Sequence, residues 1–426
     1  MTTPDRAAPR PAIAINETVV LVATLGSIYI VSQFLRNSIG VIAPDLASEL
    51  GLSASEIGLL SSTFFFSFAA FQIPLGIALD RYGPKICMVT CAGIAVVGAI
   101  IFAAASSPGG LIGARILMGI GSSCYLMGPL ALYARRYPPS QFGTLVGLQL
   151  GLGSIGTLLA TAPLAFSVAS FGWRLTFLAV AGLMLLAGLL VFVVVRDDGS
   201  QKHSQGMPRE TLRESIAGTM QALRTPSVGK LFLVNLAAYS SFVLVIGLWG
   251  GPYLTHIYGY SLTERGEVLF LAAVAQILAA FLYGPTDRLF RSHRVPVTAG
   301  ALLTSLTLAV VAVVGVLPQA ALVIWFVLFG AVCAYTPVMI AHGKALFPPH
   351  LVGRGMTLLN MGTMGGAFLA QTVSGFVINQ FPVSDGAYAL DAYRTVFALQ
   401  AAFVFIACIP YLWARDPWGE HQERGH

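Results

Sequence analysis

Long apolar runs separated by short polar segments dominate this chain. Twelve runs are close to or longer than the roughly 20 residues that a helix needs to cross the hydrocarbon core of a bilayer. They lie at residues 18–42, 57–79, 86–106, 110–134, 143–168, 173–195, 229–254, 265–284, 295–316, 319–345, 353–379 and 392–414. The pattern predicts an all-α polytopic membrane protein with twelve transmembrane helices.

One long polar stretch divides the runs into two sets of six. We therefore predict five regions, namely an N-terminal tail at 1–17, a six-helix bundle at 18–195, a linker at 196–228, a second bundle at 229–414 and a C-terminal tail at 415–426. Within the linker, the segment "ETLRESIAGTMQAL" could form an amphipathic surface helix.

The distribution of Lys and Arg predicts the orientation in the membrane. If the N-terminus is cytoplasmic, 19 of the 24 Lys and Arg residues fall on the cytoplasmic side. This bias places both termini inside and predicts a multi-pass protein of the inner membrane. The five exceptions are Arg36, Arg115, Arg174, Arg265 and Arg394.

Composition agrees with a membrane protein and excludes other classes. Hydrophobic residues make up 56% of the chain and charged residues only 10%, whereas a soluble protein carries roughly 25% charged residues. The net charge of +6 does not indicate nucleic-acid binding, because the basic residues form short clusters between apolar runs. All five cysteines lie in apolar runs, which favours packing over disulfides. The polar, proline-containing start predicts no cleavable signal peptide, and we expect a monomer.

The two sets of helices resemble each other in sequence. "GLSASEIGLL" from Gly51 matches "GYSLTERGEV" from Gly259, at an offset of 208 residues. "LDRYGPK" matches "TDRLFRS" at an offset of 207, and "RRYPPSQFG" matches "ALFPPHLVG" at an offset of 210. Three junctions in similar register predict two bundles of common ancestry. Such a repeat suits a carrier in which one bundle rocks against the other.

Three segments carry a resemblance to a known family. "GIALDRYGPK", from Gly76 to Lys85, resembles the loop signature G-x-x-x-D-R-x-G-x-K of the major facilitator superfamily. "GPTDRLFR" resembles its degenerate second copy, and "RILMGIGSS" from Arg115 resembles the R-x-x-x-G-x-G motif of helix 4. The resemblance covers essentially the whole chain and implies a secondary transporter rather than an enzyme.

The loop signature has a role that the resemblance implies and a simpler alternative. In the family it latches the cytoplasmic gate in the outward-facing state, a role that would fall to Asp80 and Arg81. The alternative is that its charges only fix topology, while its glycines permit close packing and a tight turn. The residues expected in gating are Gly76, Asp80, Arg81, Gly83, Lys85, Asp287 and Arg288.

An arginine inside the first apolar run is the main functional clue. Tyr29, Ser32, Gln33 and Arg36 follow helical spacing and form one polar stripe. A guanidinium in hydrocarbon costs at least a few kcal/mol, so the stripe should face the protein interior. Arg36 follows Val19 by 17 residues, about 25 Å along a helix, which places it in the outer half of the membrane. It could therefore snorkel to the periplasmic surface, or it could bind a carboxylate or phosphate.

Family resemblance favours anion binding. "FLRNSIGVIAPDL" resembles the segment in which sialin-like organic-anion carriers and organophosphate–phosphate exchangers place a substrate-binding arginine. The exchangers pair it with a basic residue in helix 7, but the equivalent position here is about Leu244. We therefore predict a carrier for a small, monocarboxylate-like organic anion, working in uptake. The alternatives are an exporter of amphipathic compounds, which the missing Gly-Pro pair of helix 5 disfavours, and a non-transporting sensor or scaffold.

Other polar residues within the runs are candidates for contact with substrate, although a residue of this kind is more often packed and hydrogen-bonded to a neighbouring helix. Tyr29, Gln33 and Tyr239 rank first because helices 1 and 7 line the cavity in the family. Lys344 is either a residue of the cytoplasmic rim or a second anion contact. The remaining substrate candidates are Asn235, Tyr125, Gln149, Tyr335 and Asn360.

The coupling of transport stays open at this level. The middle of each predicted span lacks Asp and Glu. The coupling candidates are His342, Arg115 and Asp45, so proton coupling, anion exchange and uniport all remain possible. We expect no cofactor, no catalytic residue and no bound metal, because helix-spaced methionines such as Met339 and Met361 more often pack than bind copper.

Overall fold

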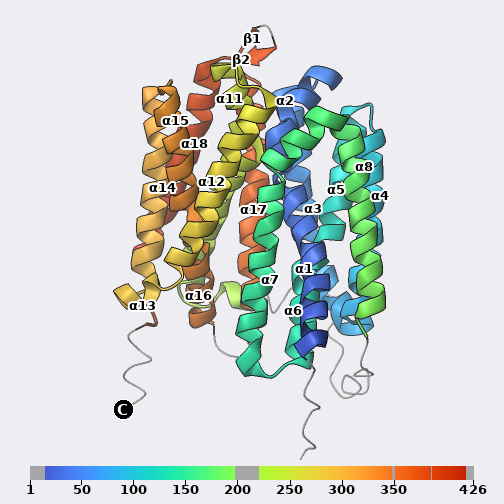
Figure 1. Cartoon of the computed structure of the whole chain (residues 1–426). Coiled ribbons are helices and arrows are strands. Elements are labelled where there is room, and N and C mark those ends of the chain that lie inside the picture. The colour runs from blue at the N-terminus through green and yellow to red at the C-terminus, as the bar shows by residue number, and fades with distance from the viewer. Residues whose placement is uncertain (1–14, 197–219, 348–350, 385, 419–426) are drawn as a thin grey trace, which may run out of the picture.

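The computed structural model describes residues 15–196, 220–347, 351–384 and 386–418. Most of the predicted tails, and residues 197–219 of the predicted linker with most of its expected surface helix, lie outside these residues. In the described part, 12 helices are long and apolar enough to cross a membrane, and each overlaps the predicted run of the same number. The fifth span ends at Leu159 and the sixth begins at Ala162, so residues 162–168 belong to the sixth span and not to the fifth as predicted. Figure 1 shows them side by side as two groups of upright helices.

The first bundle contains eight helical segments. They are α1 (Ile15–Asn37), α2 (Ile39–Leu50), α3 (Ala54–Tyr82), α4 (Pro84–Ala104), α5 (Pro108–Ser122), α6 (Cys124–Arg136), α7 (Pro139–Leu159) and α8 (Ala162–Val194). Gly172 has φ 75° within α8, so a second helix begins where the sequence predicted a span to start at 173.

The second bundle follows the same plan. Its segments are α10 (Val228–Leu244), the π-helix η3 (Val245–Trp249), α11 (Gly250–Tyr258), α12 (Leu262–Tyr283), α13 (Thr286–Phe290), α14 (Arg294–Val314), α15 (Gln319–Val332), the short 3₁₀ helix η4 (Cys333–Tyr335), α16 (Thr336–Leu346), α17 (Val352–Ile378) and α18 (Leu390–Tyr411). Between α17 and α18, β1 (Val383–Ser384) and β2 (Ala387–Tyr388) form an antiparallel pair.

The two bundles are interrupted at corresponding places. The α-helix of the first span ends at Asn37 and that of the seventh at Leu244, an offset of 207 residues. The fourth span is interrupted after Ser122 and the tenth after Val332, an offset of 210. The first span is therefore not the continuous helix 18–42 that hydrophobicity predicted, because apolarity alone does not report a local break in the backbone.

The second and eighth spans begin in the same way. Gly51 and Gly259 both adopt positive φ, at 65° and 69°, a conformation that glycine tolerates best. Ser53 and Ser261 then cap α3 and α12 in capping boxes with Glu56 and Glu264. The sequence repeat thus corresponds to a repeated structure.

The end of the molecule where α1 begins and α18 finishes is called the inner end, and the opposite end, which carries α2, α11 and the β-pair, is called the outer end (Figure 1). Lys and Arg predict that the inner end is cytoplasmic. At the outer end the bundles touch. Arg265 of α12 forms an ion pair with Asp45 of α2 and donates to the Val41 carbonyl at 2.9 Å. The Tyr388 hydroxyl accepts a hydrogen bond from the Ala54 amide at 2.8 Å.

Glycines bring the bundle backbones together near the same end. A Cβ atom on Gly251 would lie 1.9 Å from the Gly40 carbonyl oxygen, and one on Gly58 would lie 2.9 Å from Cα of Gly375. No side chain fits in either place. The outer end is therefore closed by direct contact between the two bundles.

Candidate functional site

Arg36 lies in the last turn of α1, beside the interruption of the first span. Its side chain is only 5% exposed, so it does not reach the outer surface as the snorkelling alternative requires. The centre of its guanidinium lies 4.5 Å from the centroid of the Phe68 ring on α3. This cation–π contact stabilises the positive charge through the face of the guanidinium that lies over the ring. The buried Nε atom has no hydrogen-bond partner.

The other four arginines that fall outside the inner end have oxygen partners. Arg174 pairs with Glu49, Arg265 with Asp45, and Arg394 with Asp391 at 3.1 Å. Arg115 donates to the Leu35 and Leu60 carbonyls at 2.7 and 3.2 Å. Within the described part of the chain, Arg36 is thus the member of this group without an acceptor.

Further unpaired polar atoms lie on α1 within one helical turn of Arg36. The Ser32 hydroxyl, the Gln33 side-chain carbonyl and the Asn37 side-chain carbonyl are all buried without a hydrogen-bond partner in the described structure. Asn37 donates only to the Gln33 backbone carbonyl, at 2.9 Å. Buried polar atoms are normally paired. A group of unpaired polar atoms on a single helical stripe therefore indicates a place where a ligand could bind.

Two tyrosines bring the second bundle to this stripe. The Tyr29 hydroxyl is within electrostatic reach of both Arg36 and Tyr239 of α10. Tyr239 is half-buried, and its ring contacts Phe65 of α3 edge-on, with 6.5 Å between the centroids. Tyr29, Tyr239 and Arg36 therefore lie near one another where α1, α3 and α10 meet at the boundary between the bundles. Gln33, the third candidate of highest rank, lies on α1 with its Cβ close to Gly156 of α7.

Glycines of α7 allow α1 to lie close. A Cβ atom on Gly153 would be 2.2 Å from the Tyr29 ring, and one on Gly156 would be 2.0 Å from the Ile30 carbonyl oxygen. These two glycines allow α7, which forms the fifth span, to pack closely against the polar stripe of α1.

Arg115 is the second buried charge of the first bundle. Its side chain is 0% exposed, and its guanidinium lies over the Phe64 ring at 4.6 Å. Because one of its hydrogen bonds holds the Leu35 carbonyl, it anchors the end of α1 directly before Arg36. Its Nη2 atom is buried and lacks a partner in the described structure.

Several other substrate candidates are packed inside a single bundle. Gln149 donates to the Leu25 carbonyl at 3.0 Å and accepts from Tyr133 at 3.0 Å. Asn235 donates to the Leu231 carbonyl and accepts from Thr363 at 3.2 Å. Tyr125 lies beside Cys91 and Cys124 of its own bundle, and Tyr335 packs against Gly300 and Tyr283. Asn360 is half-buried on α17, and Lys344 is exposed at the inner end.

The expected gating residues lie at the inner end. Asp80 is 3.7 Å from Arg135 of the same bundle, Arg81 lies over the Tyr82 ring at 5.2 Å, and Lys85 lies over Phe192 at 5.0 Å. Gly83 has φ 82° and joins α3 to α4, whereas a Cβ atom on Gly76 would meet open space.

In the second bundle, Asp287 accepts a hydrogen bond from the Arg288 amide at 2.6 Å. Asp80 and Asp287 thus both have a partner within their own bundle.

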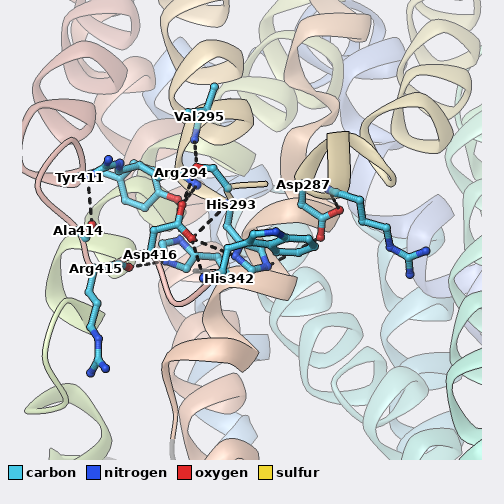
Figure 2. Close-up of polar contacts among 12 residues, drawn as sticks. Asp287, His293, Arg294, Val295, His342, Tyr411, Ala414, Arg415 and Asp416 are labelled. Atoms are coloured by element: carbon cyan, nitrogen blue, oxygen red, sulfur yellow. Dashed lines mark hydrogen bonds and ion pairs between the residues drawn. The ribbon is translucent and has the colours of Figure 1, made fainter. Parts of the chain in front are cut away.

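His342 belongs to a different polar cluster, which Figure 2 shows at the inner end of the second bundle. Its Nδ1 is 2.7 Å from the Tyr411 hydroxyl and its Nε2 is 2.9 Å from the Arg415 carbonyl oxygen. Its ring stacks on His293, which lies 3.3 Å from Asp416 and 3.8 Å from Asp287. Both His342 nitrogens are thus engaged away from Arg36.

Asp416 ties this cluster to the segment after α18. Burial alone would raise the pKa of its carboxyl, but hydrogen bonds donated by the His293 side chain, Ser292 and the Arg294 amide outweigh burial and lower the pKa well below its usual range. The Asp416 carboxylate is therefore ionised, and its hydrogen bonds hold the segment after α18 against the start of α14.

Sequence reasoning missed the aromatic partners of the buried charges. Phe64 and Phe68 lie one helical turn apart on α3 and contact Arg115 and Arg36. The phenylalanine-rich segment "FFFSF" was a visible signal, but its periodicity is that of ordinary packing. Arg265 was visible as one of the five exceptional arginines, yet its partner Asp45 is 220 residues away.

Comparison with known proteins agrees with this architecture. The chain is 23% identical over 419 residues to a protein of Bacillus subtilis (strain 168) named "Hexuronate transporter", which covers 88% of this chain and 92% of that protein. It is 27% identical over 288 residues to the "Probable sulfoacetate transporter SauU" of Cupriavidus necator, covering 65% and 66% of the two chains.

A solved structure of a bacterial homolog of the human lysosomal transporter Spinster, described as inward-facing and unoccupied, matches with a TM-score of 0.73 and 18% identity, over 94% of this chain and 97% of that one. The model of the family described as "Major Facilitator Superfamily" matches residues 25–251 and 231–425. The relatives and the structural neighbour are transporters and not enzymes. This chain, with its two repeated six-helix bundles, therefore belongs to the major facilitator superfamily and is a multi-pass membrane protein.

Proposed function

We propose that this transporter carries a small organic anion and that Arg36 holds the anion through its carboxylate. The single observation that supports this proposal is a buried arginine, 5% exposed, that has no acceptor in the described structure and lies on a stripe of further unpaired polar atoms. A guanidinium presents paired donors that match a carboxylate. An incoming anion would satisfy what the protein leaves unsatisfied.

The surroundings of Arg36 suggest the rest of the substrate. The Tyr29, Tyr239 and Phe68 rings provide apolar surfaces, whereas Ser32 and Gln33 offer hydrogen bonds to hydroxyl groups. The relatives are named for hexuronate and sulfoacetate, both of which contain a carboxylate. We therefore infer a carboxylate attached to a compact, partly polar body.

Binding of substrate is expected from the inner end in this conformation. The outer end is closed by the Arg265–Asp45 pair and by backbone contacts at glycines, and Arg36 lies on the inner side of this closure. We propose that opening the outer end, as the inner end closes, exposes the same arginine to the other side. In the proposed direction, uptake, the anion is collected at the outer end and released at the inner end.

The test is binding and flux measured on the purified full chain. Galacturonate and sulfoacetate are expected to raise the melting temperature, whereas neutral galactose is not. Arg36→Gln should abolish the shift, and Arg36→Lys should weaken binding about tenfold because the paired donors are lost.

The matched control is Arg174→Gln, which removes an arginine that is paired with Glu49 at the outer end. If Arg36→Gln and Arg174→Gln both kept wild-type binding of every anion tested, the proposed role of Arg36 would be wrong. Right-side-out and inverted vesicles then report the direction of transport.

A further inference from the structure

Two further buried polar groups without a partner lie where the bundles face each other, one on α3 and one on α17. Ser61 and Gln371 are both fully buried, and neither the Ser61 hydroxyl nor the Gln371 side-chain carbonyl has a hydrogen-bond partner in the described structure. A buried polar group without a partner costs free energy. At position 61 an alanine would fill the same place without that cost. A ligand that pairs with both groups would account for their presence.

The residues that follow them show that these two groups turn to the same side. Thr372 donates a hydrogen bond to the Ser62 hydroxyl at 2.8 Å, so these two residues face each other across the boundary between the bundles. The helix α3 begins at the outer end and α17 finishes there, so the two helices are antiparallel (Figure 1). Side chains turn by about 100° per residue along a helix. In antiparallel helices, the residues directly before a facing pair therefore point to the same side of the contact, and these residues are Ser61 and Gln371.

Arg36 lies on that side of α3. Phe65 and Phe68 follow Ser61 by four and seven residues, so all three share one face of the helix. The Phe65 ring contacts Tyr239, and the Phe68 ring contacts the Arg36 guanidinium. Seven residues correspond to about 10 Å along a helix. Because α3 runs from the outer end to the inner end, Ser61 lies farther toward the outer end than the contact between Phe68 and Arg36.

Gln371 approaches the same region from the second bundle. Its side-chain nitrogen donates to the Val243 carbonyl at 3.0 Å, and Val243 lies one helical turn after Tyr239 on α10. A backbone carbonyl only accepts hydrogen bonds, so the nitrogen of the Gln371 amide must face Val243. The oxygen is then the free atom of this amide. Gln371 therefore offers an acceptor, and the ligand group that satisfies it must be a donor.

We propose that Ser61 and Gln371 form a second subsite, which binds a hydroxyl group at the end of the anion remote from its carboxylate. This proposal rests on the proposed function, because it requires that Arg36 holds the carboxylate. The hydroxyl donates to the Gln371 oxygen and accepts from the Ser61 hydroxyl. A separation of about 10 Å between the two ends of the site suits a sugar-ring acid with a hydrogen bond at each end. The subsite thus selects hydroxylated acids over short acids that lack a donor.

Binding of galacturonate and sulfoacetate to the purified full chain tests this subsite. Both anions have a carboxylate for Arg36, but galacturonate has hydroxyl groups and sulfoacetate has none. Ser61→Ala should weaken binding of galacturonate about fivefold, because a neutral hydrogen bond is lost, and should leave sulfoacetate within about twofold of the wild type. The melting temperature of the unliganded variant should not fall, because this hydroxyl has no partner in the described structure.

Ser62→Ala is the matched control, since it removes the neighbouring hydroxyl, which is already paired with Thr372. It should lower the melting temperature and leave the ratio of the two affinities within about twofold of the wild type. Gln371→Met should reduce the preference for galacturonate about tenfold. Loss of the hydrogen bond to Val243 would by itself weaken binding of both anions alike, so the ratio separates a contact with substrate from a structural role.

Two failures can be distinguished. If Arg36→Gln abolishes binding of both anions, but Ser61→Ala and Gln371→Met leave galacturonate unaffected or weaken both anions equally, the subsite is wrong and the proposed function stands. A lower melting temperature of Ser61→Ala with an unchanged ratio would also contradict the subsite, because the hydroxyl would then be structural. If neither anion binds in an Arg36-dependent manner, the proposed function fails, and the subsite fails with it.

Discussion

The two bundles share one backbone plan but use their charged groups in opposite ways. Both have an interrupted first helix, at Asn37 and at Leu244, and both begin their second span with a glycine and a capping box. At the interruption the first bundle places Arg36, without an acceptor in the described structure, whereas the second places the buried apolar residues Val243 and Leu244. Buried charged and imidazole groups of the second bundle are instead paired, Arg265 with Asp45 at the outer end and His293 with Asp287 and Asp416 at the inner end.

The difference shows where function and stability reside. A polar group whose partners are all provided by the protein stabilises the fold, as Asp416 does with His293 and Ser292. A polar group that the protein buries and leaves unpaired costs free energy. Such a group indicates binding when its neighbours are also unpaired. The repeated frame is thus common to the two bundles, whereas the buried arginine without an acceptor in the described structure belongs to the first of them.

The largest effect is expected from a variant that makes the first bundle resemble the second at the position of Arg36. Arg36→Leu replaces the guanidinium by an apolar side chain, like those of Val243 and Leu244 at the corresponding place in the second bundle. Transport of galacturonate should fall about 100-fold or more, because a charge-assisted interaction with the substrate is lost, while the protein stays folded. Transport in proteoliposomes and size-exclusion chromatography measure the two effects, and retention of more than half of the wild-type rate would contradict the role of Arg36.

Arg115→Met should have a smaller effect on transport. The variant removes the hydrogen bonds to the Leu35 and Leu60 carbonyls, so the end of α1 is no longer held, and transport should fall about tenfold. The melting temperature should change little, because replacing a buried charge by an apolar side chain of similar size is often neutral or stabilising. Wild-type kinetics in Arg115→Met would show that the anchor is not needed.

Asp416→Asn tests the paired cluster of the second bundle. The free energy of unfolding should fall by about 1–3 kcal/mol, because hydrogen bonds from Ser292, His293 and Arg294 to a buried carboxylate are weakened. Since the pKa of this carboxyl is lowered by folding, its contribution is present above the ordinary value of about 4 and is lost as the pH falls below it.

Denaturation of the purified protein at pH 7 measures this difference. Affinity for the anion should stay within about twofold of the wild type. A large loss of affinity in Asp416→Asn together with unchanged stability would contradict our assignment of substrate binding to the site around Arg36 and of a stabilising role to this cluster.

The smallest effect is expected at Arg174→Gln. Arg174 and Glu49 are paired at the outer end, but their side chains are 40% and 43% exposed, and exposed pairs contribute about 0–1 kcal/mol. Both stability and transport should remain close to wild type in the same two assays. A severe defect would mean that the charge itself, and not its burial and lack of a partner, determines the importance of an arginine in this protein.

The sequence alone determined the membrane class, the twelve spans, the repeat and the unusual position of Arg36. Each of these features can be recognised from neighbouring positions in the sequence. A span is a run of about 20 apolar residues, and the repeat and Arg36 are recognised from short motifs and from a charge inside such a run. The resemblance to the superfamily also depended on short motifs, which the family match over residues 25–251 and 231–425 confirmed.

Only the tertiary structure decided which polar groups are paired. Gln149 and His342 were substrate or coupling candidates by type and position, yet each is satisfied by partners from another helix. Arg265 and Arg36 both lie outside the predicted cytoplasmic side, but one meets a carboxylate 220 residues away and the other, within the described residues, meets the ring of Phe68 without an acceptor. Pairing depends on what distant segments bring into contact, and that information is not present in the hydrophobic pattern around any one residue.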